Sequence, residues 1–245
     1  MKLRHEGIKR MAKPDISELR RTPAYPFVEA AHYLNLPVST LRSWCLGQRY
    51  ESKGGDDRWF AALIRLDGDR REGLSFLNLV EAHVLTAIRR VHGIPMRRVR
   101  EALDYVTHTI GVERPFADIT FQTNGVDLFV ERLGSLVNVN RGGQVEIEEF
   151  LRTYLSRIER DAAGVPIKLF PFVRSDGLKN APNPVEIDPR VAFGRPVVRG
   201  RSMPTAVLAD RFKAGDSISV LAHDLDLEPE LVEDAIRCEL ERAAA

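Results

Sequence analysis

Two short segments near the N-terminus carry polar side chains of the kind that contact DNA bases. The first starts at Pro26 and repeats apolar residues at helical spacing; the second follows an interruption at residues 35–38 and directs Leu41 and Trp44 inward. A helix reads the major groove only when a partner helix braces it and its outer face offers short polar groups and a cation. The candidate groove contacts are Ser39, also the predicted N-cap, with Thr40, Arg42 and Ser43. Helical hairpins with one exposed arginine also occur in proteins that bind no nucleic acid, so a plain structural hairpin stays open.

The segment after this pair has the composition of a β-hairpin. Residues 48–58 are polar and contain the turn sequence Gly54-Gly-Asp-Asp, and a β-like run follows from Trp59 to Leu66. Two short helices followed by a hairpin is the order of a winged helix-turn-helix. In that interpretation Arg49 and Arg58 would contact DNA from the wing.

A second set of cations lies around the predicted break between two later helices. Ser75 is expected to cap a helix that runs to about Val91, Gly93-Ile-Pro interrupts it, and Met96 begins the next. The cations that flank this break are Arg89, Arg90, Arg97, Arg98 and Arg100. Beside a reader helix they could neutralise phosphates, and Arg97 and Arg98 are the predicted phosphate contacts; the alternative is a solvated helix face.

Residues 25–107 resemble the winged helix-turn-helix of MerR-type regulators. The resemblance rests on Thr40-Leu41-Arg42, followed by Ser43 and Trp44 where the family has tyrosines, and on His92–Leu103, which is similar to the family's Gly-Phe-Ser-Leu helix. The hairpin is longer than the family's, so the path of the wing is not set by the resemblance. Because one short reader helix makes few contacts and two-fold operators match two-fold proteins, we expect a homodimer.

Residues 113–174 change to an alternating apolar and polar pattern. Strands are predicted at residues 119–123, 127–131, 136–140 and 144–147, with hairpin turns at Asn124-Gly and Arg141-Gly-Gly, then a helix at 148–161 and an extended segment at 166–173. The expected fold class is mainly α with a small α+β middle unit, a central β-hairpin and helix unit between the winged domain and a C-terminal three-helix module. The aromatic residues of the middle unit could line a ligand pocket or form a core; they are Phe116, Phe121, Phe129, Phe150, Tyr154 and Phe170.

The segment from Ile187 to Arg201 combines glycines and arginines. Arg195, Arg199 and Arg201 could clamp an anion, but the spacing is not that of a P-loop, and the glycines are as well explained by turns. Helices are expected after it at about residues 204–214, 217–224 and 229–242. The last carries Glu228, Glu230, Glu233, Asp234, Glu239 and Glu241 against Arg237 and Arg242. Phosphates would repel these acids, so this unit is predicted to bind protein.

Residues 185–240 resemble a short helical domain of unknown function found at the C-terminus of VapB-like antitoxins. The shared pattern is Asp188-Pro189, Gly194-Arg195-Pro196, Val198-Arg199-Gly200-Arg201, Pro204, Leu208, Ala214-Gly215, Leu225, Leu231 and Ala235. The resemblance implies an antitoxin of a bacterial type II toxin–antitoxin pair that neutralises a cognate toxin, a PIN-like ribonuclease, and represses its own operon through operator DNA. An inserted arginine, from this loop or from the N-terminal arm, could displace the metal of such a nuclease; occlusion of the nuclease site is an equal alternative.

Length and composition limit the remaining possibilities. The 245 residues divide into a flexible basic arm at 1–24, a winged domain at 25–112, the middle unit at 113–174, a linker at 175–184 and a helical domain at 185–245. The net charge of +1 hides the basic arm and the acidic end. Two cysteines without metal-ligand spacing, no membrane span and no catalytic motif lead us to expect a cytoplasmic protein that is not an enzyme and holds no metal or other cofactor. The alternative function is a ligand-responsive transcription regulator whose middle unit binds a small molecule.

Overall fold

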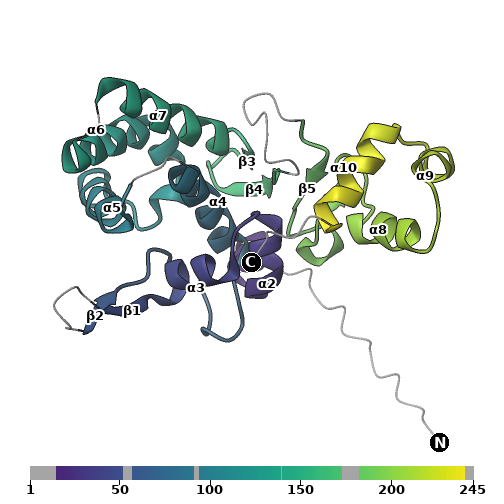
Figure 1. Cartoon of the computed structure of the whole chain (residues 1–245), viewed down its shortest axis with the longest axis horizontal. Coiled ribbons are helices and arrows are strands. Elements are labelled where there is room, and N and C mark those ends of the chain that lie inside the picture. Colours follow the sequence, from purple (N-terminus) through teal and green to yellow (C-terminus); the bar gives the residue numbers. More distant parts are fainter. Residues whose placement is uncertain (1–14, 52–56, 91–93, 139, 173–181, 241–245) are drawn as a thin grey trace, which may run out of the picture.

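The computed structural model describes residues 15–51, 57–90, 94–138, 140–172 and 182–240. Over these residues the chain is mostly helical, with three two-stranded antiparallel ladders. Two apolar cores form: the larger is built from residues 25–187 and the smaller from residues 185–238. Figure 1 shows the corresponding larger lobe and a C-terminal lobe joined to it through β5 (Val185–Glu186).

The N-terminal arm is partly docked. Residues 1–14 lie outside the described residues, but α1 (Ile16–Arg21) packs against the larger lobe, capped by the Asp15 side chain. Arg20 is buried and its Nη2 lies 2.8 Å from Oδ2 of Asp161. The prediction of a flexible arm over all of residues 1–24 is therefore wrong for its last ten residues. The sequence shows the charges of these residues but not that Arg20 pairs with Asp161, a carboxylate 141 positions later in the chain.

The predicted helical pair and hairpin are present. Helix α2 (Phe27–Tyr33) starts after Pro26, and α3 (Val38–Leu46) starts after Pro37, whose fixed φ suits a helix entry. Ser39 is therefore inside α3, and its predicted role as N-cap is wrong. Strands β1 (Gln48–Glu51) and β2 (Asp57–Phe60) pair with Arg49 opposite Trp59, and their hairpin projects at the lower left of Figure 1. The predicted β-run from Trp59 to Leu66 is thus strand only as far as Phe60.

Helix α4 (Phe76–Arg90) lies at the centre of the larger lobe. Every residue from Phe76 to Ile88 is buried, and Oγ of Ser75 accepts a hydrogen bond from the backbone N–H of Asn78, as the predicted N-cap requires. Helix α5 (Met96–Ile110) follows and ends at Gly111 in the left-handed conformation. A helix without an exposed face is stable only where other elements cover all of it.

The middle segment is helical where strands were predicted. Helices α6 (Val126–Val137) and α7 (Arg141–Leu155) follow two short turns, η1 (Pro115–Ala117) and the π-helical η2 (Phe121–Gly125). The strands predicted at 119–123, 127–131 and 144–147 are wrong, and so is the strand at 136–140 over the described residues 136–138 and 140. Val126, Phe129 and Val130 also satisfy helical spacing, and their core partners decide between the two periods. The β-structure of this region is instead the later pair β3 (Ile158–Arg160) and β4 (Pro166–Leu169).

The aromatic residues of the middle segment form a core. Phe116, Phe121 and Phe129 meet edge to face, with ring centroids 5.3–6.2 Å apart. These three, Tyr154 and Phe170 are all buried, and Phe150 is partly buried against the same core. The structure therefore favours the second of the two alternatives, in which these side chains form a core.

The C-terminal lobe begins with backbone pairing. Strand β5 pairs with β6 (Val197–Val198), and the turn η4 (Ala192–Gly194) lies between them. Helices α8 (Thr205–Lys213), α9 (Ile218–Leu225) and α10 (Pro229–Leu240) follow around the smaller core. Most of the predicted linker, residues 175–181, lies outside the described residues; Pro184, at its end, is buried.

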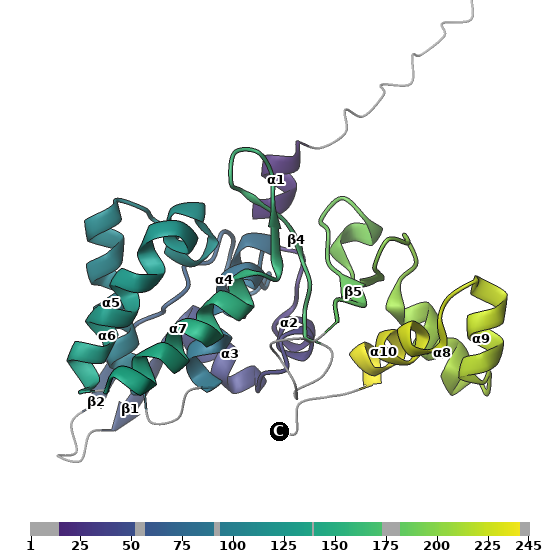
Figure 2. The ribbon, with the colours of Figure 1, turned by 90° about the horizontal axis from the view of Figure 1, so that it is seen from above.

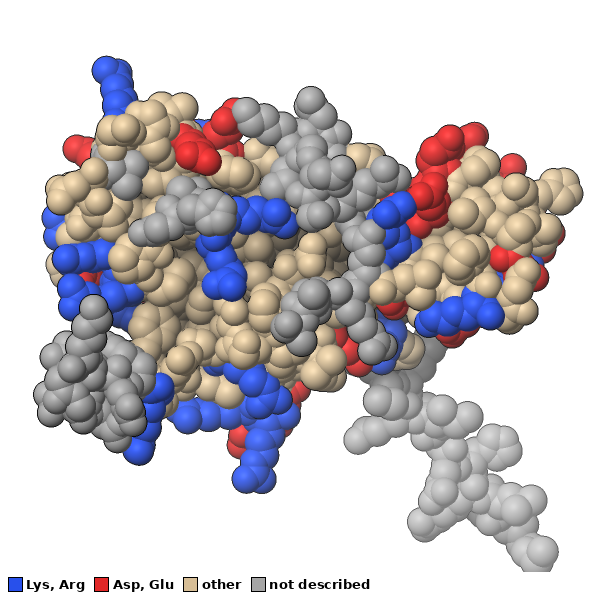
Figure 3. All heavy atoms as spheres, in the orientation of Figure 1, with Lys and Arg blue, Asp and Glu red and all other residues tan. Residues whose placement is uncertain are grey.

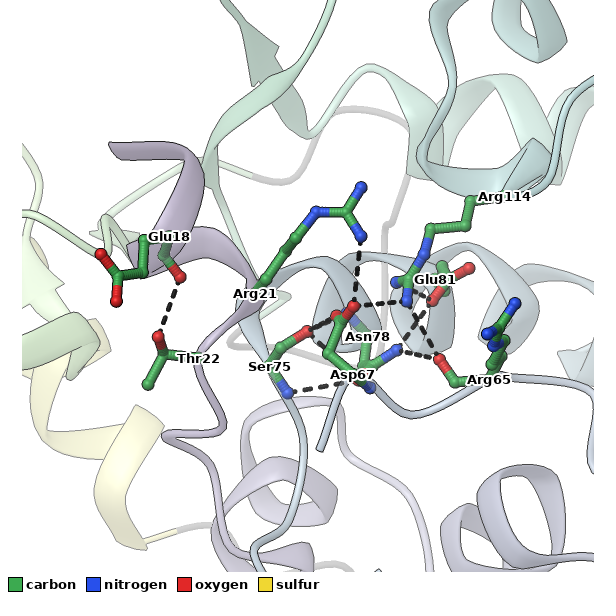
Figure 4. Close-up of polar contacts among 9 residues, drawn as sticks. All are labelled: Glu18, Arg21, Thr22, Arg65, Asp67, Ser75, Asn78, Glu81 and Arg114. Atoms are coloured by element: carbon green, nitrogen blue, oxygen red, sulfur yellow. Dashed lines mark hydrogen bonds and ion pairs between the residues drawn. The ribbon is translucent and has the colours of Figure 1, made fainter. Parts of the chain in front are cut away.

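A buried polar network fixes the start of α4 (Figure 4). Arg114 donates from Nη2 to Asp67 at 2.7 Å and from Nη1 to Glu81 at 3.2 Å, and Asn78 donates to Glu81 at 3.0 Å. Oγ of Ser75 donates to Asp67 at 2.5 Å. Burial raises the pKa of Glu81 to about 7, although Arg114 and the Asn78 hydrogen bond act in the opposite direction. The network joins the loop after β2, helix α4 and the segment that leads into η1.

Helix α4 also buries a histidine. His83 is fully surrounded, and its Nε2 lies 3.1 Å from the carbonyl oxygen of Tyr154, to which the neutral ring donates. Burial lowers the pKa of His83 to about 3.

Replacing Glu81 by Gln is expected to remove a pH dependence of stability. A folded pKa of about 7 against an ordinary value near 4.5 means that the wild-type free energy of unfolding falls as pH rises between these values. The slope of one proton is at most ~1.4 kcal/mol per pH unit. His83 titrates in the opposite direction, but its contribution is the same in wild type and in Glu81→Gln and therefore cancels when the two proteins are compared. Urea unfolding between pH 6.5 and 7.5 should therefore show a smaller fall for Glu81→Gln than for wild type. The exposed Glu131→Gln serves as control, and equal slopes for all three proteins would contradict the assignment.

Candidate nucleic-acid interface and partner loop

Helix α3 presents the predicted reader face. Leu41, Trp44 and Cys45 are buried, whereas Ser39 and Arg42 are exposed and Thr40 and Ser43 are partly exposed. The Arg42 guanidinium lies 5.2 Å from the ring centroid of Phe27, the first residue of α2. The cation–π contact restrains this arginine at the outer surface of the helical pair.

The hairpin is held beside α3 by its backbone. The carbonyl oxygen of Trp44 accepts hydrogen bonds from Leu63 and Ile64 at 2.7 and 3.0 Å, which tie the segment after β2 to the end of α3. Gly47 turns the chain into β1 with φ of 76°; a Cβ there would lie 2.6 Å from both the Phe60 carbonyl oxygen and Cζ2 of Trp59. The wing position is therefore set by close contact at a glycine. Arg49 is exposed on β1, whereas the side chain of Arg58 lies outside the described part of the chain.

A hollow of about 430 Å³ lies where α3, the hairpin and α5 meet. Its lining includes Ser43 and Trp44 from α3, Gln48, Trp59 and Phe60 from the hairpin, and Met96, Arg97 and Arg100 from α5. The structure thus brings Ser43 and Arg97, two predicted contacts from distant parts of the sequence, to one opening. Trp59 is 55% exposed at this hollow.

The five cations around the break between α4 and α5 have different environments. Arg97 and Arg98 are both ion-paired with Glu101, at 3.4 and 2.7 Å. Arg90 donates to the Tyr154 hydroxyl at 2.6 Å, and Arg100 stacks over Phe60 and donates to the Ala61 carbonyl oxygen. Arg90 and Arg100 therefore differ from the other cations of the predicted basic edge, because both are partly buried and already donate to groups of the protein. Arg89 is exposed, like Arg97. Figure 3 shows Lys and Arg along the lower left of the molecule, the side of α3, α5 and the hairpin.

The three arginines predicted in the C-terminal loop all have partners. Arg195 lies 3.7 Å from Glu29 of α2, Arg199 stacks over Phe170 at 5.1 Å, and Arg201 donates to the Asp226 carbonyl oxygen at 3.1 Å. The loop therefore lies against the first helix of the reader pair. Sequence reasoning missed Phe193 in this loop, although an aromatic residue beside Gly194 was a usable signal.

The last helix is less acidic at its surface than predicted. Asp234 is buried, and Glu239 is half-buried and accepts a 2.5 Å hydrogen bond from Thr205. Glu241 and Arg242 lie outside the described residues. Glu228 and Glu230 are exposed, and Glu233 pairs with Arg237 at 2.5 Å. Only part of the predicted acidic surface thus faces solvent.

The described residues contain neither a cluster of metal ligands nor a helix that could span a membrane. No group of three or more His, Cys, Asp or Glu is placed to hold a metal ion there. None of the helices in that part of the chain has the length and apolar character that crossing a membrane needs.

Comparison with known proteins places the chain in a family. Residues 23–103 match the family described as "Putative DNA-binding HTH domain", and residues 185–237 match "Protein of unknown function (DUF433)". The chain is 30% identical over 248 residues to "Putative antitoxin VapB45" of Mycobacterium tuberculosis, across 92% of this chain and 98% of that protein. The chain belongs to the VapB45 antitoxin family.

The fold of this VapB45-family chain has also been observed in a crystal. The crystal structure of Rv2018 from Mycobacterium tuberculosis superposes with a TM-score of 0.62, covering 88% of this chain and 97% of that one at 23% identity. The helix-turn-helix match includes α2, α3, the hairpin, α4 and about the first half of α5, and the match to DUF433 begins at β5 and ends within α10. The two candidate surfaces of this family member therefore lie in its two matched regions.

Replacing Gly47 by Ala is expected to displace the hairpin from α3. The added Cβ would meet Phe60 and Trp59 at 2.6 Å in a left-handed backbone, so the free energy of unfolding should fall by about 2–3 kcal/mol. Gly111→Ala is the matched control, because Gly111 also has a positive φ of 68° but nothing within 4 Å of the added Cβ. Urea unfolding and tryptophan emission would measure both variants. Equal losses, with the emission of Trp59 unchanged, would show that contact at Gly47 does not position the hairpin.

Proposed function

We propose that this VapB45-family chain is a DNA-binding antitoxin of a type II toxin–antitoxin pair. It acts in the cytoplasm, represses its own operon as a homodimer and neutralises a cognate toxin, a PIN-like ribonuclease. The observation that carries the proposal is the 30% identity to an antitoxin along nearly the whole chain. The exposed polar face of α3 beside a fixed hairpin supports the DNA-binding part.

The proposed DNA contacts follow from the arrangement of the reader pair. Helix α3 enters the major groove in the MerR manner, with Thr40, Arg42 and Ser43 toward the bases and Ser39 at its edge. Arg49 and Arg58 contact the DNA from the hairpin, and Arg97 and Arg98 contact phosphates. Two copies are required because one short helix and one hairpin make few contacts, so the operator has two half-sites.

The toxin contact belongs to the C-terminal region in this proposal. Arg195 is the arginine best placed to leave its partner for a nuclease carboxylate, because its ion pair with Glu29 is long, at 3.7 Å, and its side chain is 60% exposed. Arg199 and Arg201 are held by an aromatic ring and a backbone carbonyl, which favours a positioning role for them. Arginine insertion and occlusion both fit this geometry.

A second candidate function is a ligand-responsive MerR-like regulator. The hollow between α3, the hairpin and α5 favours it, because aromatic and guanidinium groups together suit a planar anion. Such a ligand would touch the wing and the reader helix at once.

Co-expression with the adjacent open reading frame separates the two functions. An antitoxin co-purifies with that gene's product and restores growth of cells that express it, whereas a ligand-responsive regulator does neither. RNA cleavage by the partner protein alone, and its absence when the partner is in the purified complex, would identify the toxin as a ribonuclease. No complex and no rescue would overturn the antitoxin proposal.

Replacing Arg42 by Ala is expected to weaken operator binding by about 10- to 100-fold, the cost of ~1–3 kcal/mol for one base-reading or backbone arginine. Fluorescence anisotropy with a DNA fragment from upstream of the gene, titrated at several salt concentrations, measures both affinity and salt slope. Arg132→Ala is the matched control, because Arg132 also lies over an aromatic ring, Tyr105 at 5.0 Å, but on α6. Unchanged affinity and slope for Arg42→Ala would contradict the placement of α3 in the groove.

Replacing Glu101 by Gln is expected to strengthen operator binding. Both Arg97 and Arg98 are ion-paired with this carboxylate, so its neutralisation frees two cations for phosphates and steepens the salt dependence. Stability should change by less than about 0.5 kcal/mol, because these are surface pairs. Glu131→Gln again controls for the loss of one negative charge. A weaker or equal affinity for Glu101→Gln would place Arg97 and Arg98 away from the DNA.

A further inference from the structure

The loop between β5 and β6 has an unusual surface composition. In the part of the chain from Ile187 to Arg201, the exposed residues are Arg190, Phe193, Arg195, Arg199, Gly200 and Arg201. Phe193 is 95% exposed, the highest value among the described exposed large apolar side chains. Arginine and aromatic residues are the types that dominate the energetics of protein interfaces.

Phe193 is held in a conformation that its own side chain disfavours. Ala192, Phe193 and Gly194 have φ values of 47°, 56° and 77°, so three consecutive residues are left-handed. Only glycine adopts this region without steric cost. Because the ring of Phe193 is almost wholly in solvent, no packing of that ring offsets the cost. Backbone strain that no side-chain packing offsets is typical of binding and catalytic sites.

The surroundings impose this conformation on the loop. The buried carboxylate of Asp188 accepts hydrogen bonds from the backbone N–H of Arg190 at 2.9 Å and from its Nη2 at 2.6 Å. Backbone hydrogen bonds of 2.9 and 3.1 Å, from Gly194 to Val191 and from Arg195 to Ala192, close the turn. Gly194 packs so closely on Tyr25 that a Cβ would lie 2.4 Å from the Tyr25 hydroxyl oxygen. The loop is thus preorganised, which lowers the entropy cost of binding.

The geometry points to Phe193 as the anchor of a protein-binding surface. Its occupant is a protein with an apolar pocket edged by carboxylates: the pocket takes the ring of Phe193, and the carboxylates face Arg190 and Arg195, which are 47% and 60% exposed. This assignment rests on the proposed antitoxin function, in which that protein is the toxin, and adds the apolar contact to it.

A single-stranded nucleic acid is a poorer occupant of the same surface. Arginine and phenylalanine could stack on bases, but the same lobe exposes the carboxylates of Glu228 and Glu230, and its cations Arg211 and Lys213 are already ion-paired with Asp210, Asp216 and Asp224. Figure 3 shows acidic side chains along the upper surface of this lobe. They would repel a polyanion, whereas a compact protein pocket needs to face only the loop.

The test uses the full chain and the product of the adjacent open reading frame as the binding partner. Phe193→Ala is expected to weaken the complex by at least about 30-fold in isothermal titration calorimetry, as for an anchor side chain. Phe193→Gly should lose as much affinity and yet melt at the same or a higher temperature, because glycine relieves the left-handed strain. Phe212→Ala, which removes another exposed ring from the same lobe, is the control and should bind like wild type.

Three other outcomes would overturn the inference, and each rejects a different claim. A wild-type complex that Phe193→Ala leaves unchanged, or that Phe212→Ala weakens equally, rejects Phe193 as anchor while the antitoxin function stands. Failure of the wild-type chain to bind the adjacent gene product rejects the antitoxin function and this partner together. Loss of single-stranded RNA or DNA binding by Phe193→Ala, with the protein complex intact, assigns the loop to nucleic acid.

Discussion

The burial of Phe76–Ile88, all of α4 except its last two residues, is the constraint on which the larger lobe depends. These thirteen consecutive residues leave no side of the helix exposed, and α1, η1, β4 and α7 all pack on it. Figure 2 shows α1, α4, β4 and α7 from above. The polar residues of α4, which are Asn78, Glu81, His83 and Thr86, are each hydrogen-bonded. A buried polar group without a partner costs about 1–3 kcal/mol, so these bonds also fix how the neighbouring segments are aligned. The reader pair is attached to this frame by the antiparallel bridge of Tyr25 and Leu74.

Local signals in the sequence predicted the helices whose first residue is determined by a capping residue or a proline beside it. Pro26, Ser75 and Gly93-Ile-Pro gave the starts of α2 and α4 and the start of α5. The secondary structure predicted for the middle segment was wrong because short stretches such as residues 127–131 fit both a strand and a helix. Tertiary contacts decide: Phe129 and Leu133 pack into the core from one face of α6. The residues of the predicted reader face lie on one helix, α3, because helical spacing is a local pattern. The left-handed backbone at Phe193 depends on Tyr25 and Asp188, which no local pattern reveals.

The sequence indicates a basic N-terminal part and an acidic C-terminal end, but several of these charged residues are buried or paired in the structure. Asp234 is internal and Glu239 is partly so, while Arg20, Arg90 and Arg100 are committed to partners in the larger lobe. Many arginines are nonetheless exposed among the described residues, and several of them lie beside a carboxylate, such as Arg97 beside Glu101. The affinity of such a surface for a polyanion depends on which ion pairs open, since a pair on the surface contributes only about 0–1 kcal/mol and exchanges readily.

The two candidate surfaces meet at α2. Phe27 on this helix contacts Arg42 of the reader face, and Glu29 pairs with Arg195 of the partner loop, two residues from Phe193. Tyr25, just before α2, packs on Gly194. A partner that draws Arg195 away from Glu29 therefore changes the charge at the helix that braces α3. Binding free energies are reciprocal: whatever factor such a partner applies to operator affinity, the operator applies to partner affinity. If the proposed DNA and toxin surfaces are both used, the short helix α2 lies between them and can couple them without a separate sensor domain.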